Sequence, residues 1–424
     1  MRGSFRIARV AAAAGAIALL TVAGCAATSS VTATSGGATS PSAPASTSAS
    51  AAPSARASSP SAATASTASP AMPAGGPVPA GFSATSVTFV SLQQAFVLGT
   101  APCVNKPCTS ILRTLNRGGT WQGLPAPVVP LGQPENTTGS AVWGIRFATP
   151  SIGFVFGNGL WETTDGGEHW AKVAAPGGSI VSLEVIDGQV LALTAACRPA
   201  SGSGCSRDGT LARRPLTGGS WQVTATVSIG YSVDQAELIA TQARVAAVLD
   251  GSRVLVTTDG GLTTAEHPTP CTGPAPGGLY ATQSVAVTGP TSLALLCSSD
   301  DGAMGSMAKS VYVSSDLGAS WTKMAAPPIA GDPWQIAGGS ATTLVVGAFS
   351  GASWLYSSGD GGARWSTALQ ADNGGMGWND LGFTSPSDGV VVSGPAITDG
   401  NAGGRQGRLL VPNDGGAVWE QLAF

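Results

Sequence analysis

Short runs in which apolar and polar residues alternate follow one another along most of the chain. The clearest set is 142–147, 153–157, 160–163 and 170–173, which contains segments such as VWGIRF and GFVFG. Alternation with β-branched and aromatic residues predicts half-buried strands. A second set with the same spacing occupies 378–383, 389–393, 408–411 and 418–422. The pattern therefore predicts repeated groups of four short strands.

One stretch departs from this pattern. Residues 233–250 contain no glycine or proline, and their apolar spacing is also typical of an amphipathic helix. We expect two strands there, because the neighbouring repeats leave little room for a helix.

An eight-residue segment separates the third and fourth strands of the clearest set, Thr163–Trp170 (TTDGGEHW). We call it the repeat motif; related segments are 114–121, 214–221, 257–264, 314–321, 358–365 and 412–419. Aligned on their last residues, the seven copies are spaced by 43 to 57 residues. A period near fifty is typical of a propeller or an array with one unit per repeat. Seven such units account for residues 81–424.

The pattern Ser/Thr-x-Asp-x-Gly-x-x-Trp resembles the Asp-box (BNR) repeat of sialidases, sortilin-type receptors, some glycoside hydrolases and the photosystem II assembly factor family. The resemblance covers residues 81–424 and implies an all-β, seven-bladed β-propeller. It implies that the motif is a turn between the third and fourth strands, on the rim opposite the ligand face. The motif aspartate would accept amide hydrogen bonds, and its glycines would supply positive φ. These are structural roles, not catalytic ones.

The first 25 residues have the features of a bacterial lipoprotein signal peptide. Arg2, Arg6 and Arg9 precede the apolar run 10–22, which is too short to span a bilayer stably. The segment ends in Val-Ala-Gly-Cys, which resembles a lipobox with Cys25 as the lipidated residue. An ordinary secretory signal is the alternative.

Residues 26–80 are almost wholly Ala, Ser, Thr, Pro and Gly, with Arg56 as the one charged residue. Such a segment has too little apolar bulk to offset the entropy of ordering, so we expect a disordered tether. We therefore expect an extracytoplasmic protein, lipid-anchored to the bacterial membrane.

The net charge and the composition of the chain limit the classes of partner and of fold that we expect. The formal net charge is −3, which gives no basic footprint for nucleic acid. The 59 glycines and the 10% of charged residues are typical of a turn-rich β domain. We expect a monomer that needs no cofactor.

Six cysteines follow Cys25, an even number that indicates disulfides in an exported domain. The strand map selects three pairs: Cys103–Cys108, Cys197–Cys205 and Cys271–Cys297. A metal site is the alternative, but neither short pair has Cys-x-x-Cys spacing, and the two histidines lie apart from them. We expect no metal.

Catalytic residues are hard to find in the sequence. A sialidase would require an arginine triad on the inner strands, and Arg146 alone occupies such a position. A glycosidase would require two carboxylates facing each other across a cleft, and no such pair stands out. We predict no catalytic residue, and the enzyme alternative depends on two carboxylates lining the mouth of the channel.

Aromatic residues recur where the innermost strands begin, on the face opposite the motifs. Such rings can stack on sugars or hold apolar side chains, and they can equally pack between blades. The candidate ligand-binding residues are Trp143, Arg146, Tyr231, Tyr280, Trp334, Trp378 and Asp380. We expect a non-catalytic propeller that binds an envelope protein or a carbohydrate; an extracellular glycoside hydrolase or lyase is the alternative.

Overall fold

The computed structural model describes residues 72–104, 107–132, 139–197, 205–228, 237–240, 244–250, 252–271, 282–303, 305–372, 377–394 and 407–424. The chain divides into two units, Met1–Ser66 and Thr67–Phe424, and every described residue belongs to the second. Cys25 and most of the expected tether therefore lie outside the described residues. The described part contains no helix long and apolar enough to cross a membrane.

The described residues form 28 strands in seven antiparallel sheets of four, each built from consecutive strands. The first three sheets are β1 (Ser83–Phe89), β2 (Ala95–Pro102), β3 (Pro107–Thr114), β4 (Gln122–Leu124); β5 (Val142–Phe147), β6 (Gly153–Gly157), β7 (Leu160–Thr163), β8 (Ala171–Val173); and β9 (Ser179–Ile186), β10 (Gln189–Cys197), β11 (Cys205–Pro215), β12 (Gln222–Ser228). The next two are β13 (Leu238–Ala240), β14 (Ala246–Asp250), β15 (Arg253–Thr257), β16 (Ala265–Pro268); and β17 (Thr282–Val287), β18 (Leu293–Ala303), β19 (Ser306–Ser314), β20 (Thr322–Lys323). The last two are β21 (Asp332–Gly338), β22 (Leu344–Phe349), β23 (Ser353–Ser358), β24 (Ser366–Ala371); and β25 (Trp378–Phe383), β26 (Gly389–Ser393), β27 (Arg408–Val411), β28 (Glu420–Leu422).

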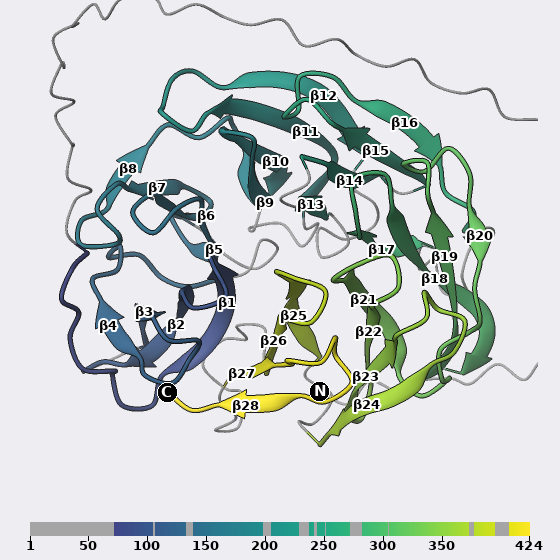
Figure 1. Cartoon of the computed structure of the whole chain (residues 1–424). Coiled ribbons are helices and arrows are strands. Elements are labelled where there is room, and N and C mark those ends of the chain that lie inside the picture. Colours follow the sequence, from purple (N-terminus) through teal and green to yellow (C-terminus); the bar gives the residue numbers. More distant parts are fainter. Residues whose placement is uncertain are drawn as a thin grey trace, which may run out of the picture. The chain divides into compact units, whose positions relative to one another are not determined.

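The seven sheets are the blades of a β-propeller, and the first strand of each lies nearest the centre of the ring (Figure 1). This confirms the predicted all-β, seven-bladed fold. The ambiguous stretch 233–250 contains β13 and β14, as expected for two strands. Its first residues, 233–236, lie outside the described part.

The hydrophobic core is divided among the interfaces between blades. Buried apolar residues form seven clusters, and each cluster combines side chains from two adjacent blades. The cluster between blades one and two, for example, packs Phe96 on Phe147 with ring centroids 3.5 Å apart. A four-stranded sheet is stable here because each of its faces is covered by a neighbour.

Each repeat motif with an aspartate forms a tight turn between the third and fourth strands. In the second blade, Asp165 Oδ1 accepts hydrogen bonds from the backbone amides of Glu168 and His169, both at 3.0 Å. Gly166 and Gly167 have φ of 77° and 92°, which favours glycine at these positions. The Gly166 amide donates to Ser151 O at 2.9 Å. Since Ser151 lies between β5 and β6, the motif is at the same end of the blade as the first hairpin turn.

The folded part of the chain begins before residue 81, where the sequence analysis ended the tether. Gly76 and Gly123 of β4 exchange two backbone hydrogen bonds, at 2.7 and 2.9 Å. The buried Arg113 donates to Pro73 O at 2.5 Å, and Val78 packs into the cluster between blades seven and one. Residues 72–80 therefore form a strap along the outer edge of blade one, which their low-complexity composition did not indicate.

Candidate functional site

The innermost strands are deformed at similar positions. Register shifts occur in β1, β5, β9, β17, β21 and β25, all within their pairing to the second strand of the blade. A β-bulge turns a strand locally and re-aims its side chains. Asp380, in the irregular part of β25, has a positive φ of 48°.

The free edges of these strands face the centre of the ring, and neighbouring blades satisfy many of their amides. Ser86 Oγ accepts from Ile145 N at 3.2 Å, and Ser284 Oγ accepts from Ile336 N at 3.1 Å. Carboxylates do the same at two other interfaces: Glu237 binds Val285 N and Asp380 binds Val87 N, both at 2.8 Å. The inner edges are therefore joined by side chains of the preceding blade, which protects otherwise unpaired strand edges.

Four charged side chains meet in the channel, and we call them the channel cluster: Arg146, Glu184, Glu237 and Asp380. Arg146 Nε lies 3.0 Å from Glu184 Oε1, and Arg146 Nη2 lies 3.5 Å from Asp380 Oδ1. Arg146 Nη1 also donates to Ile145 O at 2.9 Å and to Val87 O at 3.4 Å. Glu237 Oε2 accepts from Ser284 Oγ at 2.8 Å.

Burial and charge shift the ionisation of this cluster. Burial raises the pKa of Glu237 to about 7, although hydrogen bonds from Val285 and Ser284 lower it in part. Burial also raises the pKa of Glu184, against the charge of Arg146. Burial by itself would lower the pKa of Arg146, but the charges of Glu184 and Asp380 raise it overall. Arg146 therefore stays protonated, whereas Glu237 changes charge near neutral pH.

Two contiguous cavities follow the axis of the ring. The deeper one, of about 310 Å³, holds the channel cluster together with Trp334 and Gly382. The wider one, of about 620 Å³, is lined by the far ends of the inner strands and by the first hairpin turns, including 147–148, 287–289 and 383–386. Because these turns contact the repeat motifs, the wider cavity opens on the motif end of the ring.

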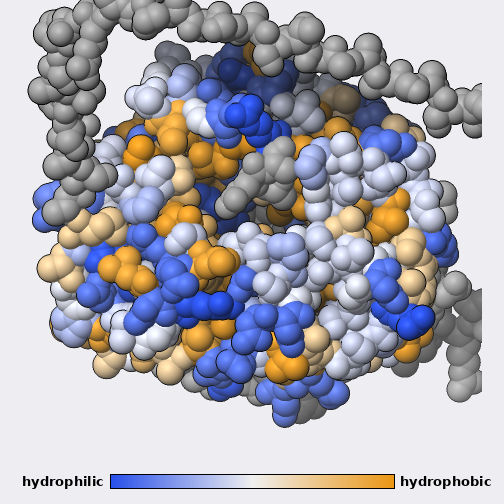
Figure 2. Space-filling view, viewed as in Figure 1, coloured by the Kyte–Doolittle hydropathy of each residue, from blue (hydrophilic) through white to orange (hydrophobic). Residues whose placement is uncertain are grey.

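This location differs from the face on which the sequence analysis expected the ligand. The connections expected on the opposite face lie outside the described residues: 133–138, 198–204, 229–236, 272–281, 373–376 and 395–406. The prediction for that face stays a prediction. In the space-filling view, hydrophobic residues occur in separate groups among hydrophilic ones, so this view offers no single large apolar surface (Figure 2).

Three of the predicted ligand residues, Arg146, Trp334 and Asp380, line the deeper cavity together. The Trp334 indole donates to Trp378 O at 2.9 Å, which joins blades six and seven. Trp378 is 1% exposed and donates to Ala348 O and Trp354 O, so it packs between blades. Trp143 packs in the cluster between blades two and three. Tyr231 and Tyr280 lie outside the described residues.

Sequence reasoning missed Glu184 and Glu237. Glu184 of β9 is the register partner of Leu191 near the start of β10, and Arg146 of β5 is the register partner of Phe154 near the start of β6. The two charged residues therefore occupy equivalent positions on the inner strands of adjacent blades. An alignment of the repeats on their inner strands would have revealed this. Glu237 lies in the stretch whose secondary structure was ambiguous, which hid its place directly before the inner strand β13.

Two of the three expected disulfides are present. Cys103 bonds Cys108 between β2 and β3, and Cys271 bonds Cys297 of β18, with Cα–Cα distances of 5.8 and 5.5 Å. Cys197 and Cys205 are register partners of β10 and β11, as the third pairing requires. Their side chains lie outside the described part.

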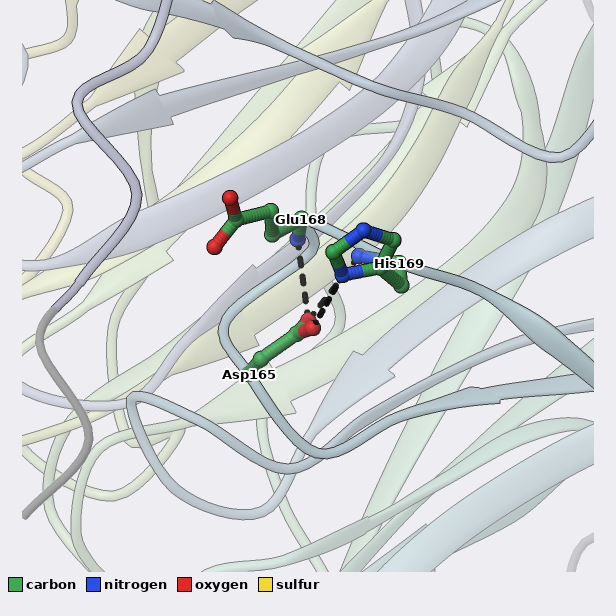
Figure 3. A group of neighbouring side chains, drawn as sticks. All are labelled: Asp165, Glu168 and His169. Atoms are coloured by element: carbon green, nitrogen blue, oxygen red, sulfur yellow. Dashed lines mark hydrogen bonds and ion pairs between the residues drawn. The ribbon is translucent and has the colours of Figure 1, made fainter.

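One group in the described residues has three side chains close enough for a metal ion, at the repeat motif of blade two: Asp165, Glu168 and His169. Figure 3 shows the His169 ring turned toward Asp165, whose Oδ2 lies 2.8 Å from Nδ1. Burial opposes the change, but hydrogen bonds from His169 and Thr163 lower the pKa of Asp165 to about 2. The hydrogen bond to Asp165 raises the pKa of His169. This contact completes the turn, and Glu168 and His169 are exposed on the rim.

The fold is similar to that of solved propellers. A structure described as YCF48 bound to D1 peptide is 16% identical, with a TM-score of 0.53, over 80% of this chain and 95% of that one. YCF48 from Cyanidioschyzon merolae is 13% identical, with a TM-score of 0.51, over 80% and 97% of the two chains. A polysaccharide lyase bound to a sulfated sugar is 14% identical over 79% and 92%, but its TM-score of 0.47 is too low to bear on function. No family model matches the chain, and no curated protein matches its sequence.

Proposed function

We propose that this protein is a bacterial lipoprotein of the Asp-box type, anchored at Cys25, whose propeller binds an envelope protein or glycan without catalysing a reaction. The observation that supports binding most directly is the axial cavity of about 620 Å³, open at the motif end and continuous with the channel cluster. A concave site with a few convergent polar groups is the usual form of a ligand site. The similar propeller that was solved with a D1 peptide supports the same use of the fold.

A substitution at the mouth of the wider cavity tests this proposal. Gly289 lines the cavity, has no positive φ, and would place a Cβ 3.6 Å from the nearest atoms of Ser292. We expect Gly289→Trp to fold normally and to abolish binding of glycans on an array and of proteins from envelope extracts. Gly359→Trp is the matched control, because a Cβ there meets no atom within 4 Å and the residue lies outside the cavity. Unchanged binding by Gly289→Trp would contradict the location.

A glycoside hydrolase or lyase is the second candidate, favoured by Glu184 and Glu237, two carboxyls with raised pKa in one cavity. Both already interact with the protein, since Glu184 pairs with Arg146 while Ser284 and Val285 donate to Glu237. We therefore prefer binding. Release of sugar ends from envelope polysaccharide by the wild type, and not by Glu237→Gln, would favour the enzyme.

The anchor is tested separately. We expect Cys25→Ser to move the protein from the membrane fraction to the soluble fraction, because the apolar run 10–22 is too short to hold it stably in a bilayer. Fractionation followed by immunoblotting measures this. A variant that stays in the membrane pellet would require a second anchor.

A further inference from the structure

The lining of the channel has an excess of negative charge. Of the charged residues that line the two cavities, one is cationic, Arg146, and four are acidic: Glu184, Asp187, Glu237 and Asp380. Asp187 forms an ion pair with Arg244, which is not part of the lining. Glu184 and Asp380 share the single guanidinium of Arg146, and Glu237 is not paired with it.

The backbone groups on the inner edges of the channel also favour a ligand that donates hydrogen bonds. The amides of Val87, Ile145, Val285 and Ile336, on the free edges of the inner strands, are already bound by side chains of adjacent blades. Within the described residues, no hydrogen bond reaches the carbonyl oxygen of Ile336, which lines the deeper cavity. The amides on these edges are therefore occupied, whereas the Ile336 carbonyl stays an open acceptor.

Arg146 shows how carboxylates and backbone carbonyls of the channel bind a cationic side chain. Its guanidinium binds the carboxylates of Glu184 and Asp380 and donates to the carbonyl oxygens of Ile145 and Val87. Glu237 lies on the side of the channel formed by blades four and five, where it meets Ser284 and Val285 but no cation among the described residues. A second positive group would complete the charge balance there.

The spacing of these acids argues against a metal ion. The one group of described side chains that converges closely enough for a metal is on the rim, at Asp165, and the channel carboxyls do not converge in that way. A cation of extended shape can instead reach Glu237 and the Ile336 carbonyl from the wider cavity, which has room for a peptide backbone.

We propose that the channel receives a lysine or arginine side chain of a protein partner, inserted from the motif end of the ring toward Glu237. This proposal rests on the binding function above. The backbone of the partner occupies the wider cavity, and the cationic group meets Glu237 and the carbonyl oxygen of Ile336 on blade six.

The test uses the full-length protein in detergent and four fluorescent glycine-flanked peptides that differ in one central residue: lysine, arginine, norleucine or glutamate. We expect the lysine or the arginine peptide to bind at least about tenfold more tightly than the norleucine peptide. Fluorescence anisotropy measures the affinities. Equal binding of all four peptides, or no binding of either cationic peptide, would overturn the proposal. Equal competition by free spermidine or by calcium would also count against a protein side chain.

Variants separate this proposal from the binding function itself. Glu237→Gln keeps an acceptor for Ser284 and Val285 but removes the charge, so we expect the cationic peptide to bind about tenfold more weakly. Glu420→Gln, on the exposed outer strand β28, removes the same charge away from the channel and serves as the control. If Gly289→Trp abolishes binding but Glu237→Gln matches Glu420→Gln, the cavity binds a ligand and the cation proposal is wrong.

The pH dependence gives an independent readout. The pKa of Glu237 is about 7, so wild-type binding is expected to strengthen as its carboxyl ionises from about pH 6 to about pH 8. The other charged groups of the channel are Arg146 on β5, Glu184 on β9 and Asp380 on β25. Glu237→Gln should flatten this profile, while Glu420→Gln should keep it. A profile that persists in Glu237→Gln would assign the titration to another group and contradict the proposed contact.

Discussion

The polar residues of this protein act mainly by satisfying backbone groups that the fold leaves open. In the repeat motifs, Asp165, Asp259 and Asp316 accept amide hydrogen bonds within their own turns. On the inner strand β1 and directly before β13, Ser86 and Glu237 accept hydrogen bonds from amides of the next blade. Polar side chains thus satisfy amides both in the motif turns and along the inner strands, and only those along the inner strands bring charge into a cavity. Whether an acidic residue lies on the rim or in the channel therefore depends on its place in the blade.

The motif aspartates are expected to contribute to stability and not to binding. Asp165→Ala removes acceptors for two turn amides, so the free energy of unfolding should fall by roughly 1–2 kcal/mol. Chemical denaturation measures this change, and ligand affinity measured on the folded variant should equal that of the wild type. Wild-type stability with lost affinity would mean that the motif itself contacts the ligand.

At the scale of elements, the strands could be predicted from sequence but their pairing across blades could not. The bounds of β5, β6, β7, β25, β26 and β27 coincide with the alternating runs, because alternation and glycine turns are local signals. The contact between Asp380 and Val87 joins residues 293 positions apart and depends on a positive φ at a non-glycine residue. No local pattern encodes such a contact. The sequence pointed to Arg146 and Asp380 as separate polar residues. Their contact with each other and with Glu184 depends on how the blades are arranged in the ring.

The motif tryptophans add a second set of contacts between elements of adjacent blades. Trp170, Trp221 and Trp365 each donate from the indole nitrogen to a carbonyl just after the motif of the preceding blade: Pro125, Ala174 and Ala325. These bonds, of 2.8 to 3.1 Å, lie on the outer side of the ring. The motif therefore joins blades as well as turning the chain, a role that its local sequence did not reveal.

The two observed disulfides are expected to differ in their effect on stability. Cys103–Cys108 closes a short loop within blade one, with a sequence separation of 5, whereas Cys271–Cys297 joins the end of blade four to blade five, with a separation of 26. Loop-closure entropy predicts that loss of the longer pair costs about 1.5 kcal/mol more. Double Cys→Ser variants of each pair, compared by denaturant unfolding, measure this difference. An equal or larger loss from the short pair would show that strain or packing outweighs the entropy term.

At the scale of the whole molecule, the described residues close the ring through side chains and short backbone contacts, and none of their sheets combines strands from the two ends of the chain. All seven sheets consist of consecutive strands, and β28 lies beside blade one in Figure 1. Arg117 forms an ion pair with Asp388, and Gly407 exchanges hydrogen bonds with Ser83 and Ala84. This junction holds blades one and seven together, and with them the ion pair between Asp380 of blade seven and Arg146 of blade two, which flank blade one.

The last residue of the chain is expected to stabilise this closure. The Phe424 ring meets Phe82 at 5.0 Å and Trp121 at 5.2 Å, both edge to face, so it covers the junction between the first and last blades. Phe424→Ala should lower the free energy of unfolding by about 2 kcal/mol and speed hydrogen exchange in β1 and β28 more than elsewhere. Val418→Ala, at a side chain 58% exposed in the same blade, is the control. Uniform exchange across all seven blades in Phe424→Ala would mean that the ring opens as one unit and that this junction is no weaker than the other six interfaces.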